Sequence, residues 1–189
     1  VRETVPIALA GQRIDRIVSI VADVPRAAAA SLIEAAAVRI DGEVVVVLDQ
    51  ATKQWALNEL ASGRTIDLVW TLRFHLVFNS GMAFSRGQGS GRIIGLLAIG
   101  VIVWLWRGLS RQHSKLAIFG TALLIGGALG NVVDRLFRGE AWLGGSVVDF
   151  IDLQWFPVFN IADSAVSVGA LLVVSWLYST HRRSKSIQP

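Results

Sequence analysis

Residues 116–133 read LAIFGTALLIGGALGNVV, a stretch of 18 residues without a charge. A helix needs roughly 20 mostly apolar residues to cross a bilayer, so this stretch predicts a membrane span. Two further apolar runs, Ile93–Trp106 and Ile161–Tyr178, predict two more spans. The composition agrees, because only 17% of the residues are charged, whereas soluble domains average about 25%.

The basic residues predict how these spans are oriented. Basic loops stay on the cytoplasmic side of a membrane. The link 107–115 and the tail 181–185 are both basic, so we expect both of them in the cytoplasm. Residues 52–91 and 135–160 then lie on the outer side. Indoles favour the membrane interface, and five tryptophans fall near predicted span ends: Trp104, Trp106, Trp142, Trp155 and Trp176.

Glycines recur along the middle apolar stretch, at positions 120, 126, 127 and 130. Small residues spaced in this way let neighbouring helices approach closely in a membrane. We therefore expect close helix packing along this span.

The segment before residue 44 differs in composition from the rest of the chain. Residues 1–43 hold five basic and six acidic residues, and their opening predicts no secretory signal. Two short helices, 14–21 and 27–38, and a hairpin with its turn at Asp41-Gly42 are expected there. The predicted organisation is a small soluble α+β module at 1–43, a membrane domain at 44–181 and a basic cytoplasmic tail at 182–189.

Carboxylates gather at the edges of the predicted spans, where ionisable groups are costly and mark functional sites. Two carboxylates held together share one proton, so that one can activate water while the other polarises a carbonyl. This device hydrolyses amides without a cysteine or a metal. Each carboxylate could instead cap a helix or pair with Arg135 or Lys53, and the pattern leaves open which two aspartates meet. The candidates are Asp49, Asp134, Asp149, Asp152 and Asp163.

Other hydrolytic chemistries fit the sequence less well. There is no cysteine and no His-Glu-x-x-His zinc motif, so we expect neither a metal nor another cofactor. His113 and His181 fall in the predicted cytoplasmic segments, which leaves only His75 for a serine–histidine–aspartate triad. A serine–lysine dyad would have to use Lys53.

Four short blocks of sequence surround the predicted spans. They read LDQATK at 48–53, NSGMAFS at 79–85, GGALGNVVDR at 126–135 with VVDF at 147–150, and PVFNIADS at 157–164. In these residues, and in this order, the chain resembles the bacterial lipoprotein signal peptidases (signal peptidase II). With the last span, the resemblance covers residues 44–180, about three quarters of the chain.

Together with the three clear spans predicted above, the resemblance implies a mainly α, polytopic helical membrane protein with a small β element at the outer face. The chain departs from the family in its first span, which is truncated. The resemblance also implies an aspartic endopeptidase of the bacterial cytoplasmic (inner) membrane. Its partners would be membrane lipid and diacylglyceryl-modified prolipoproteins, which it would cleave before the lipidated cysteine. The implied catalytic pair is Asp149 and Asp163. The implied supporting and substrate-binding residues are Asp49, Lys53, Asn79, Gly81, Asn131, Asp134, Arg135 and Asn160.

The first 43 residues resemble a different protein, the small RNA-binding module at the front of large-subunit pseudouridine synthases. The resemblance lies in Val5–Arg16, Leu32–Glu34 and Val38–Gly42. Basic and acidic residues nearly cancel here, so the positive footprint for RNA is missing and RNA is not an expected partner. Charges before Val44 argue against a full first span. An inactive fusion or truncated homologue with an RNA-binding-like head is therefore the alternative, and no oligomeric state is predicted.

Overall fold

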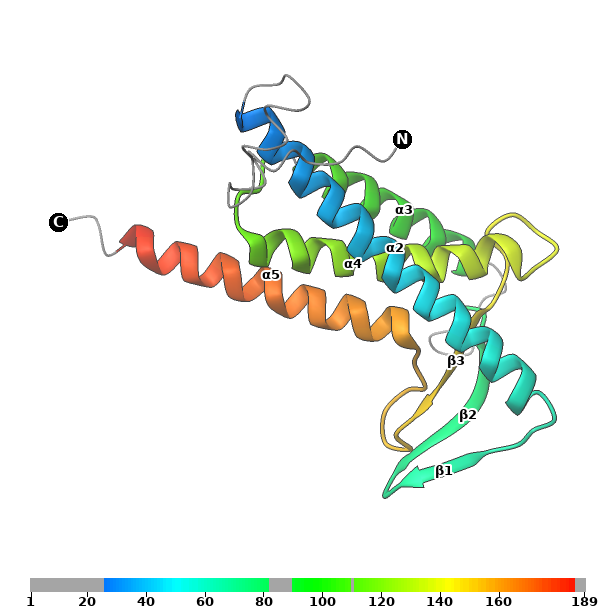
Figure 1. Ribbon diagram of the computed structural model, residues 1–189. Helices are drawn as coiled ribbons and strands as arrows, with labels where there is room; N and C mark the ends of the chain where they lie inside the picture. The colour runs from blue at the N-terminus through cyan, green and yellow to red at the C-terminus, as the bar shows by residue number, and fades with distance from the viewer. Residues whose placement is uncertain (1–25, 82–89, 110, 186–189) are drawn as a thin grey trace, which may run out of the picture.

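The computed structural model describes residues 26–81, 90–109 and 111–185. In this part of the chain, four long helices form a bundle with a small sheet at one end (Figure 1). The helix predicted at 14–21 lies outside the described residues. The elements follow in the order α2 (Arg26–Leu60), β1 (Ile66–Val69), β2 (Leu72–Asn79), α3 (Ser90–Leu109), α4 (Lys115–Phe137), β3 (Val147–Asp152) and α5 (Ile161–Lys185).

The three predicted spans are confirmed as helices. Among the described residues, three helices are long and apolar enough to cross a membrane, and they correspond to α3, α4 and α5. The link between α3 and α4 lies at the end of the bundle away from the sheet, as does the basic end of α5 (Figure 1). The described chain is therefore a polytopic helical protein with a small β element at one end.

Helix α4 is the centre of the bundle, because α2, α3 and α5 all pack against it. Of its apolar stretch, 56% is buried inside the protein, against 11% for α3 and for α5. A helix that is apolar on its exposed sides suits lipid and not water. α3 and α5 thus present most of their apolar surface outward.

The glycines of α4 allow the close packing that the sequence predicts. A Cβ on Gly127 would overlap the carbonyl oxygen of Ala162 in α5 and come within 2.8 Å of a Val166 methyl carbon. A Cβ on Gly126 would lie 2.8 Å from the carbonyl oxygen of Gly42 in α2. α2 and α5 therefore contact α4 on its backbone.

The hairpin predicted at Asp41-Gly42 is wrong, because α2 continues as one helix from Arg26 to Leu60. Asp-Gly favours a turn in isolation, but here the missing side chain of Gly126 in α4 lets α2 approach closely at Gly42. Tertiary packing thus overrides the local turn preference. The predicted domain boundary at residue 43 falls inside this helix and stays a prediction. One stripe of α2 is buried at helical spacing: Gly42, Val45, Asp49, Lys53, Ala56 and Leu60.

The sheet is antiparallel, with the strand order β1-β2-β3. It is fixed to the end of α2 by Trp55, whose ring contacts Phe74 of β2 and Phe150 of β3 edge-on, with centroids 5.1 Å and 6.1 Å apart. The chain between β3 and α5 folds back on the sheet, since the N–H of Phe159 donates to the carbonyl of Ile151 at 3.0 Å. These contacts fix β3 beside the first turn of α5.

The contact at Gly127 predicts a specific stability defect. A Gly127→Val side chain would push α5 away from α4, and overpacking of this kind costs about 3 kcal/mol or more when backbone must move. Thermal unfolding of the purified protein in detergent measures the loss. Gly100→Val on α3 is the matched control, because no atom lies within 4 Å of a Cβ there. Equal losses in the two variants would contradict the packing argument.

Candidate active site

Asp149 and Asp163 come from different elements and meet at one asparagine. Asp149 lies on β3 and Asp163 in the first turn of α5. The side-chain amide of Asn160 donates to Asp149 Oδ1 at 2.7 Å, and its backbone N–H donates to Asp163 Oδ2 at 3.2 Å. In return, the N–H of Asp163 donates to Asn160 Oδ1 at 2.9 Å. This reciprocal arrangement is a capping box, so the cap that begins α5 also couples the two carboxylates.

Two further asparagines hold the remaining carboxylate oxygens. Asn79, at the end of β2, donates to Asp149 Oδ2 at 3.1 Å. Asn131, on α4, donates to Asp163 Oδ1 at 2.8 Å. Asn131 Oδ1 also accepts from Asn160 at 3.1 Å. Every oxygen of the pair is thus oriented by an amide, and three separate elements set the geometry.

Gly81 positions Asn79 for this contact. The N–H of Gly81 donates to Asn79 Oδ1 at 2.9 Å. Gly81 has φ +89°, a conformation that residues with a side chain rarely adopt, and a Cβ there would lie 2.9 Å from the Cα of Gly91 on α3. A glycine is therefore required where β2 turns toward α3.

A buried ion triad lies next to the aspartate pair. Lys53 Nζ is 2.8 Å from Asp49 Oδ2 and 2.8 Å from Asp134 Oδ2, and all three side chains are fully buried. Its third hydrogen bond goes to Asn131 Oδ1 at 3.0 Å. An ammonium group has three donors, so Lys53 is completely satisfied.

The two carboxylates of the triad in turn hold the backbone that carries the pair. Asp49 Oδ1 accepts the N–H of Ala162 at 3.0 Å, next to Asp163 in sequence. Asp134 Oδ2 accepts the N–H of Val148 at 3.1 Å, next to Asp149. The triad thus positions Asp149 and Asp163 without contacting them directly.

Two members of this network were not predicted from the sequence. Gln50 donates to Asp134 Oδ1 at 3.0 Å and to the carbonyl of Gly130 at 3.1 Å. Arg138 donates to Asp134 Oδ1 at 2.8 Å. Arg138 follows Asp134 by four residues, a spacing that favours ion pairs on a helix and could have identified it. Gln50 reaches across from another helix, and no local pattern marks that contact.

Arg135 lies beside the network. Its guanidinium is buried, and Nη1 donates to the carbonyl of Gly145 at 3.5 Å. Among the carboxylates, the charge of Asp149 interacts most strongly with this guanidinium, followed by those of Asp134 and Asp163. A Cβ on Gly91 would lie 2.8 Å from Arg135 Nη1, so a glycine at that position leaves room for the guanidinium.

The environment of Asp149 favours its protonated form. Burial raises its pKa, the hydrogen bond from Asn79 opposes that rise, and the negative charge of Asp163 adds to it. The resulting pKa of Asp149 is about 6, against an ordinary 3.8. Asp149 therefore holds a proton in mildly acidic solution beside a second carboxyl group, as in a dyad that shares one proton.

Asp152, the fifth acidic candidate, is engaged elsewhere. It pairs with Arg73 on the neighbouring strand, 2.7 Å from Nε. Burial acts to raise the pKa of Asp152, but hydrogen bonds from the Gln154 N–H and from Arg73 outweigh it and lower the pKa. His75 Nδ1 lies 3.7 Å from the same carboxylate. This cluster orients strands and does not join the Asp149–Asp163 network.

The described residues offer no cluster of three His, Cys, Asp or Glu side chains that could hold a metal ion. The polar groups of the site are carboxylates, amides, one buried ammonium and the guanidinium groups of Arg135 and Arg138. Such a set can position a water molecule and move a proton. All ten residues named by the sequence lie in or directly beside one connected polar cluster: Asp49, Lys53, Asn79, Gly81, Asn131, Asp134, Arg135, Asp149, Asn160 and Asp163.

The chain is similar to several known proteins. The sequence model described as "Signal peptidase (SPase) II" matches residues 43–179. A lipoprotein signal peptidase of Mycobacterium leprae is 44% identical over 133 residues, which cover 69% of this chain and 66% of the relative. One of Mycolicibacterium smegmatis is 42% identical over 134 residues, covering 70% of this chain and 57% of the relative.

Two solved structures are similar in fold. One described as a bacterial membrane enzyme superimposes with a TM-score of 0.66 at 28% identity and covers 75% of this chain and 92% of that chain. A second, similarly described, has a TM-score of 0.67 at 27% identity, covering 82% and 94%. The chain belongs to the signal peptidase II family. It spans slightly less than two thirds of the length of the Mycobacterium leprae relative, and with its apolar helices it is a multi-pass protein of the bacterial inner membrane.

The buried triad predicts a large effect of removing its cation. Lys53→Met leaves Asp49 and Asp134 buried without their shared partner, and breaking a buried pair in this way costs about 3–5 kcal/mol. The loss is measured as the decrease in thermal stability in detergent. Lys115→Met, at an exposed position that begins α4, should change stability by less than about 0.5 kcal/mol. A Lys53 variant as stable as this control would show that the triad is dispensable.

Proposed function

We propose that this protein is a membrane aspartic endopeptidase that removes signal peptides from diacylglyceryl-modified prolipoproteins, cleaving before the lipidated cysteine. The observation that carries the proposal is the attachment of Asp149 and Asp163 to the same asparagine, with a pKa near 6 for one of them. Membership of the signal peptidase II family, and relatives named lipoprotein signal peptidase, support this substrate class.

The proposed reaction uses the two carboxyl groups as acid and base. Asp163, ionised, takes a proton from a water molecule, and the water oxygen attacks the scissile carbonyl carbon. Asp149, protonated, donates its proton to the carbonyl oxygen as the tetrahedral intermediate forms. As the intermediate collapses, the C–N bond breaks, the leaving amine takes the proton held by Asp163, and a hydroxyl group of the intermediate returns its proton to Asp149. The pair then again holds one proton.

The surrounding residues have positioning roles in this proposal. Asn79, Asn131 and Asn160 hold the carboxylate oxygens of the aspartate pair in fixed positions through hydrogen bonds. The Lys53 triad fixes the backbone on either side of the pair. Gly81 allows the tight turn after β2 in which its N–H donates to Asn79 Oδ1, and it thereby positions Asn79. Arg135 adds positive charge that favours the ionised carboxylate and the developing oxyanion.

Substrate delivery in this proposal occurs through the membrane. The acyl chains of the prolipoprotein stay in lipid beside the apolar helices, so the cleavage site is presented at a fixed depth and proximity replaces a large binding surface. By the distribution of basic residues, the sheet end of the bundle faces the outer side, and the C-terminus faces the cytoplasm. The N-terminal segment would lie on the cytoplasmic side as well.

Substitution of either aspartate tests the assignment. Asp149→Asn and Asp163→Asn should each lower the cleavage rate of a lipidated prolipoprotein by at least about 10³-fold in reconstituted vesicles, because each removes one partner of the acid–base pair. Asp67→Asn, at an exposed position on β1, is the matched control and should cleave at the normal rate. Failure of the intact chain to cleave would favour the inactive-homologue alternative, and full activity of either variant would refute the assignment.

The pKa of Asp149 predicts the pH dependence. Because the reaction needs one proton on the pair, kcat/KM should fall as the pH rises through about 6, where Asp149 ionises. The hydrogen bond from Asn79 favours the ionised form, so Asn79→Ala should move this limb to higher pH. The pH–rate profiles of the two proteins measure the shift. Asn58→Ala, at an exposed position on α2, should leave the profile unchanged, and an unmoved limb in Asn79→Ala would contradict the coupling.

A further inference from the structure

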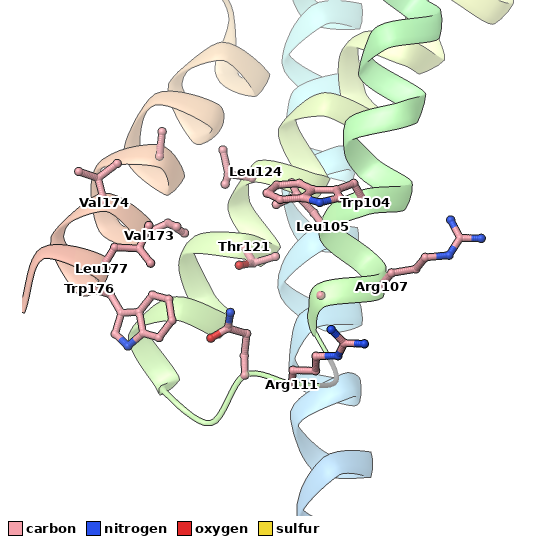
Figure 2. Close-up of a pocket in the computed structure, with 13 residues that line it drawn as sticks. Trp104, Leu105, Arg107, Arg111, Thr121, Leu124, Val173, Val174, Trp176 and Leu177 are labelled. Atoms are coloured by element: carbon pink, nitrogen blue, oxygen red, sulfur yellow. The ribbon is translucent and has the colours of Figure 1, made fainter. Parts of the chain in front are cut away.

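A cavity lies at the end of the bundle away from the aspartate pair. It occupies about 540 Å³ between α3, α4 and α5 (Figure 2), a volume in the range of small-molecule sites. α3 and α5 each pack against α4, and all three helices contribute residues to the lining. Its wall is mainly apolar and includes Leu105, Leu124, Val173, Val174 and Leu177.

One polar group in the wall of this cavity lacks a partner. Thr121 of α4 is 6% exposed and lines the cavity. No described residue hydrogen-bonds to its hydroxyl, although threonines and serines elsewhere, such as Thr52 and Ser167, donate to the carbonyl four residues earlier. Figure 2 shows the Thr121 oxygen directed into the space between α4 and α5. The described residues contain no fully buried side-chain nitrogen or oxygen without a partner, so this hydroxyl is reachable from the cavity and can donate to an occupant with a hydrogen-bonding group.

The mouth of the cavity is positively charged. Arg107 and Arg111 lie at the end of α3 and just beyond it, and both are exposed. Within the described ranges neither guanidinium forms an ion pair. Gln112 adds an amide at the same edge. Trp104 and Trp176 flank the cavity from α3 and α5 (Figure 2), and indoles in membrane proteins mark the headgroup level.

We propose that this cavity is a binding site for one anionic phospholipid. The phosphate lies at the mouth beside Arg111 and Arg107, a glycerol ester oxygen accepts a hydrogen bond from Thr121, and an acyl chain extends along Leu124 and Val173. The combination of an apolar channel, a single inward hydroxyl and an unpaired cationic rim matches an amphiphile with a negative head. Basic pockets between membrane helices recognise such headgroups.

The surroundings favour a lipid over a soluble anion. The cavity is bounded by α3 and α5, the two helices whose apolar stretches are only 11% buried and so face the lipid. A free phosphate ester would pair with the arginines but leave the apolar channel empty. A lipid with a neutral headgroup would fill the channel and leave the arginines unpaired. Only a lipid that is both anionic and acylated satisfies the rim, the hydroxyl and the wall together.

Native mass spectrometry of the full chain in detergent tests the proposal, with phosphatidylglycerol, phosphatidylcholine and soluble glycerol phosphate as probes. Each basic residue near an anionic headgroup contributes about 1 kcal/mol, so Arg107→Gln with Arg111→Gln should weaken phosphatidylglycerol binding about 30-fold. Thr121→Val keeps the side-chain shape and should weaken it about 5-fold by removing one hydrogen bond. Arg182→Gln with Arg183→Gln removes the same charge from the end of α5 outside the cavity lining, and should change binding less than about 2-fold.

The outcomes separate the possible occupants. Tight phosphatidylglycerol binding that is lost in the Arg107/Arg111 variant and kept in the Arg182/Arg183 variant supports the site. Equal binding of phosphatidylcholine, equal binding of glycerol phosphate, or equal losses in the two double variants would overturn it. Circular dichroism and thermal unfolding verify that each variant is folded. The assay involves no peptide cleavage, so its result is independent of the proposed peptidase activity.

Discussion

The buried ion triad of Lys53, Asp49 and Asp134 is the interaction on which the rest of the structure depends. Charges removed from water cost several kcal/mol each unless geometry and hydrogen bonding compensate. Here the compensation is complete, because Lys53 uses all its donors and each carboxylate also accepts a backbone N–H. A shift of α2 by one residue against α4 would break several of these bonds at once. The triad therefore fixes the helix register and, through Ala162 and Val148, the places where α5 and β3 begin to carry the aspartate pair.

Such short contacts require helix backbones that nearly touch, and the glycines of α4 make this possible. Gly130 illustrates the constraint, because a Cβ there would lie 2.6 Å from Asp49 Oδ2. The absence of a side chain at Gly130 lets α2 pack closely against α4, and it leaves the space that the Asp49 carboxylate occupies. In this bundle, the same glycine therefore serves both close helix packing and the burial of a hydrogen-bonded carboxylate. Small residues in membrane helices allow close van der Waals packing, and here they also make room for charged side chains in the protein interior.

The residue pattern predicted the spans more completely than the site, and the difference has physical reasons. Apolar runs such as 116–133 predict helices because a bilayer leaves a chain few other ways to satisfy its backbone. The pattern of residues left the pairing of five aspartates open, and only the resemblance selected Asp149 and Asp163. In the structure, Asp152 is engaged apart from the aspartate pair, because it forms a cross-strand ion pair with Arg73. The predicted hairpin at Asp41-Gly42 was wrong because a local turn preference contains no information about the packing of α4 against this part of the chain. Gln50 stayed hidden because its partners lie on another helix.

The two ends of the bundle satisfy their polar groups in different ways. At the sheet end, the buried side-chain polar atoms of the described residues have hydrogen-bond partners within the chain. Three asparagines share the task of orienting the oxygens of the aspartate pair. At the opposite end, the exposed Arg107 and Arg111 and the cavity-lining hydroxyl of Thr121 form no ion pair or hydrogen bond with another described residue. Internal satisfaction makes a rigid site that can hold a carboxyl group at an unusual pKa. Incomplete satisfaction at the other end is stable only where the surroundings supply the missing contacts, and for a helix bundle in a bilayer those surroundings are lipid. The polar groups therefore divide the molecule into an end organised by its own side chains and an end that depends on the membrane.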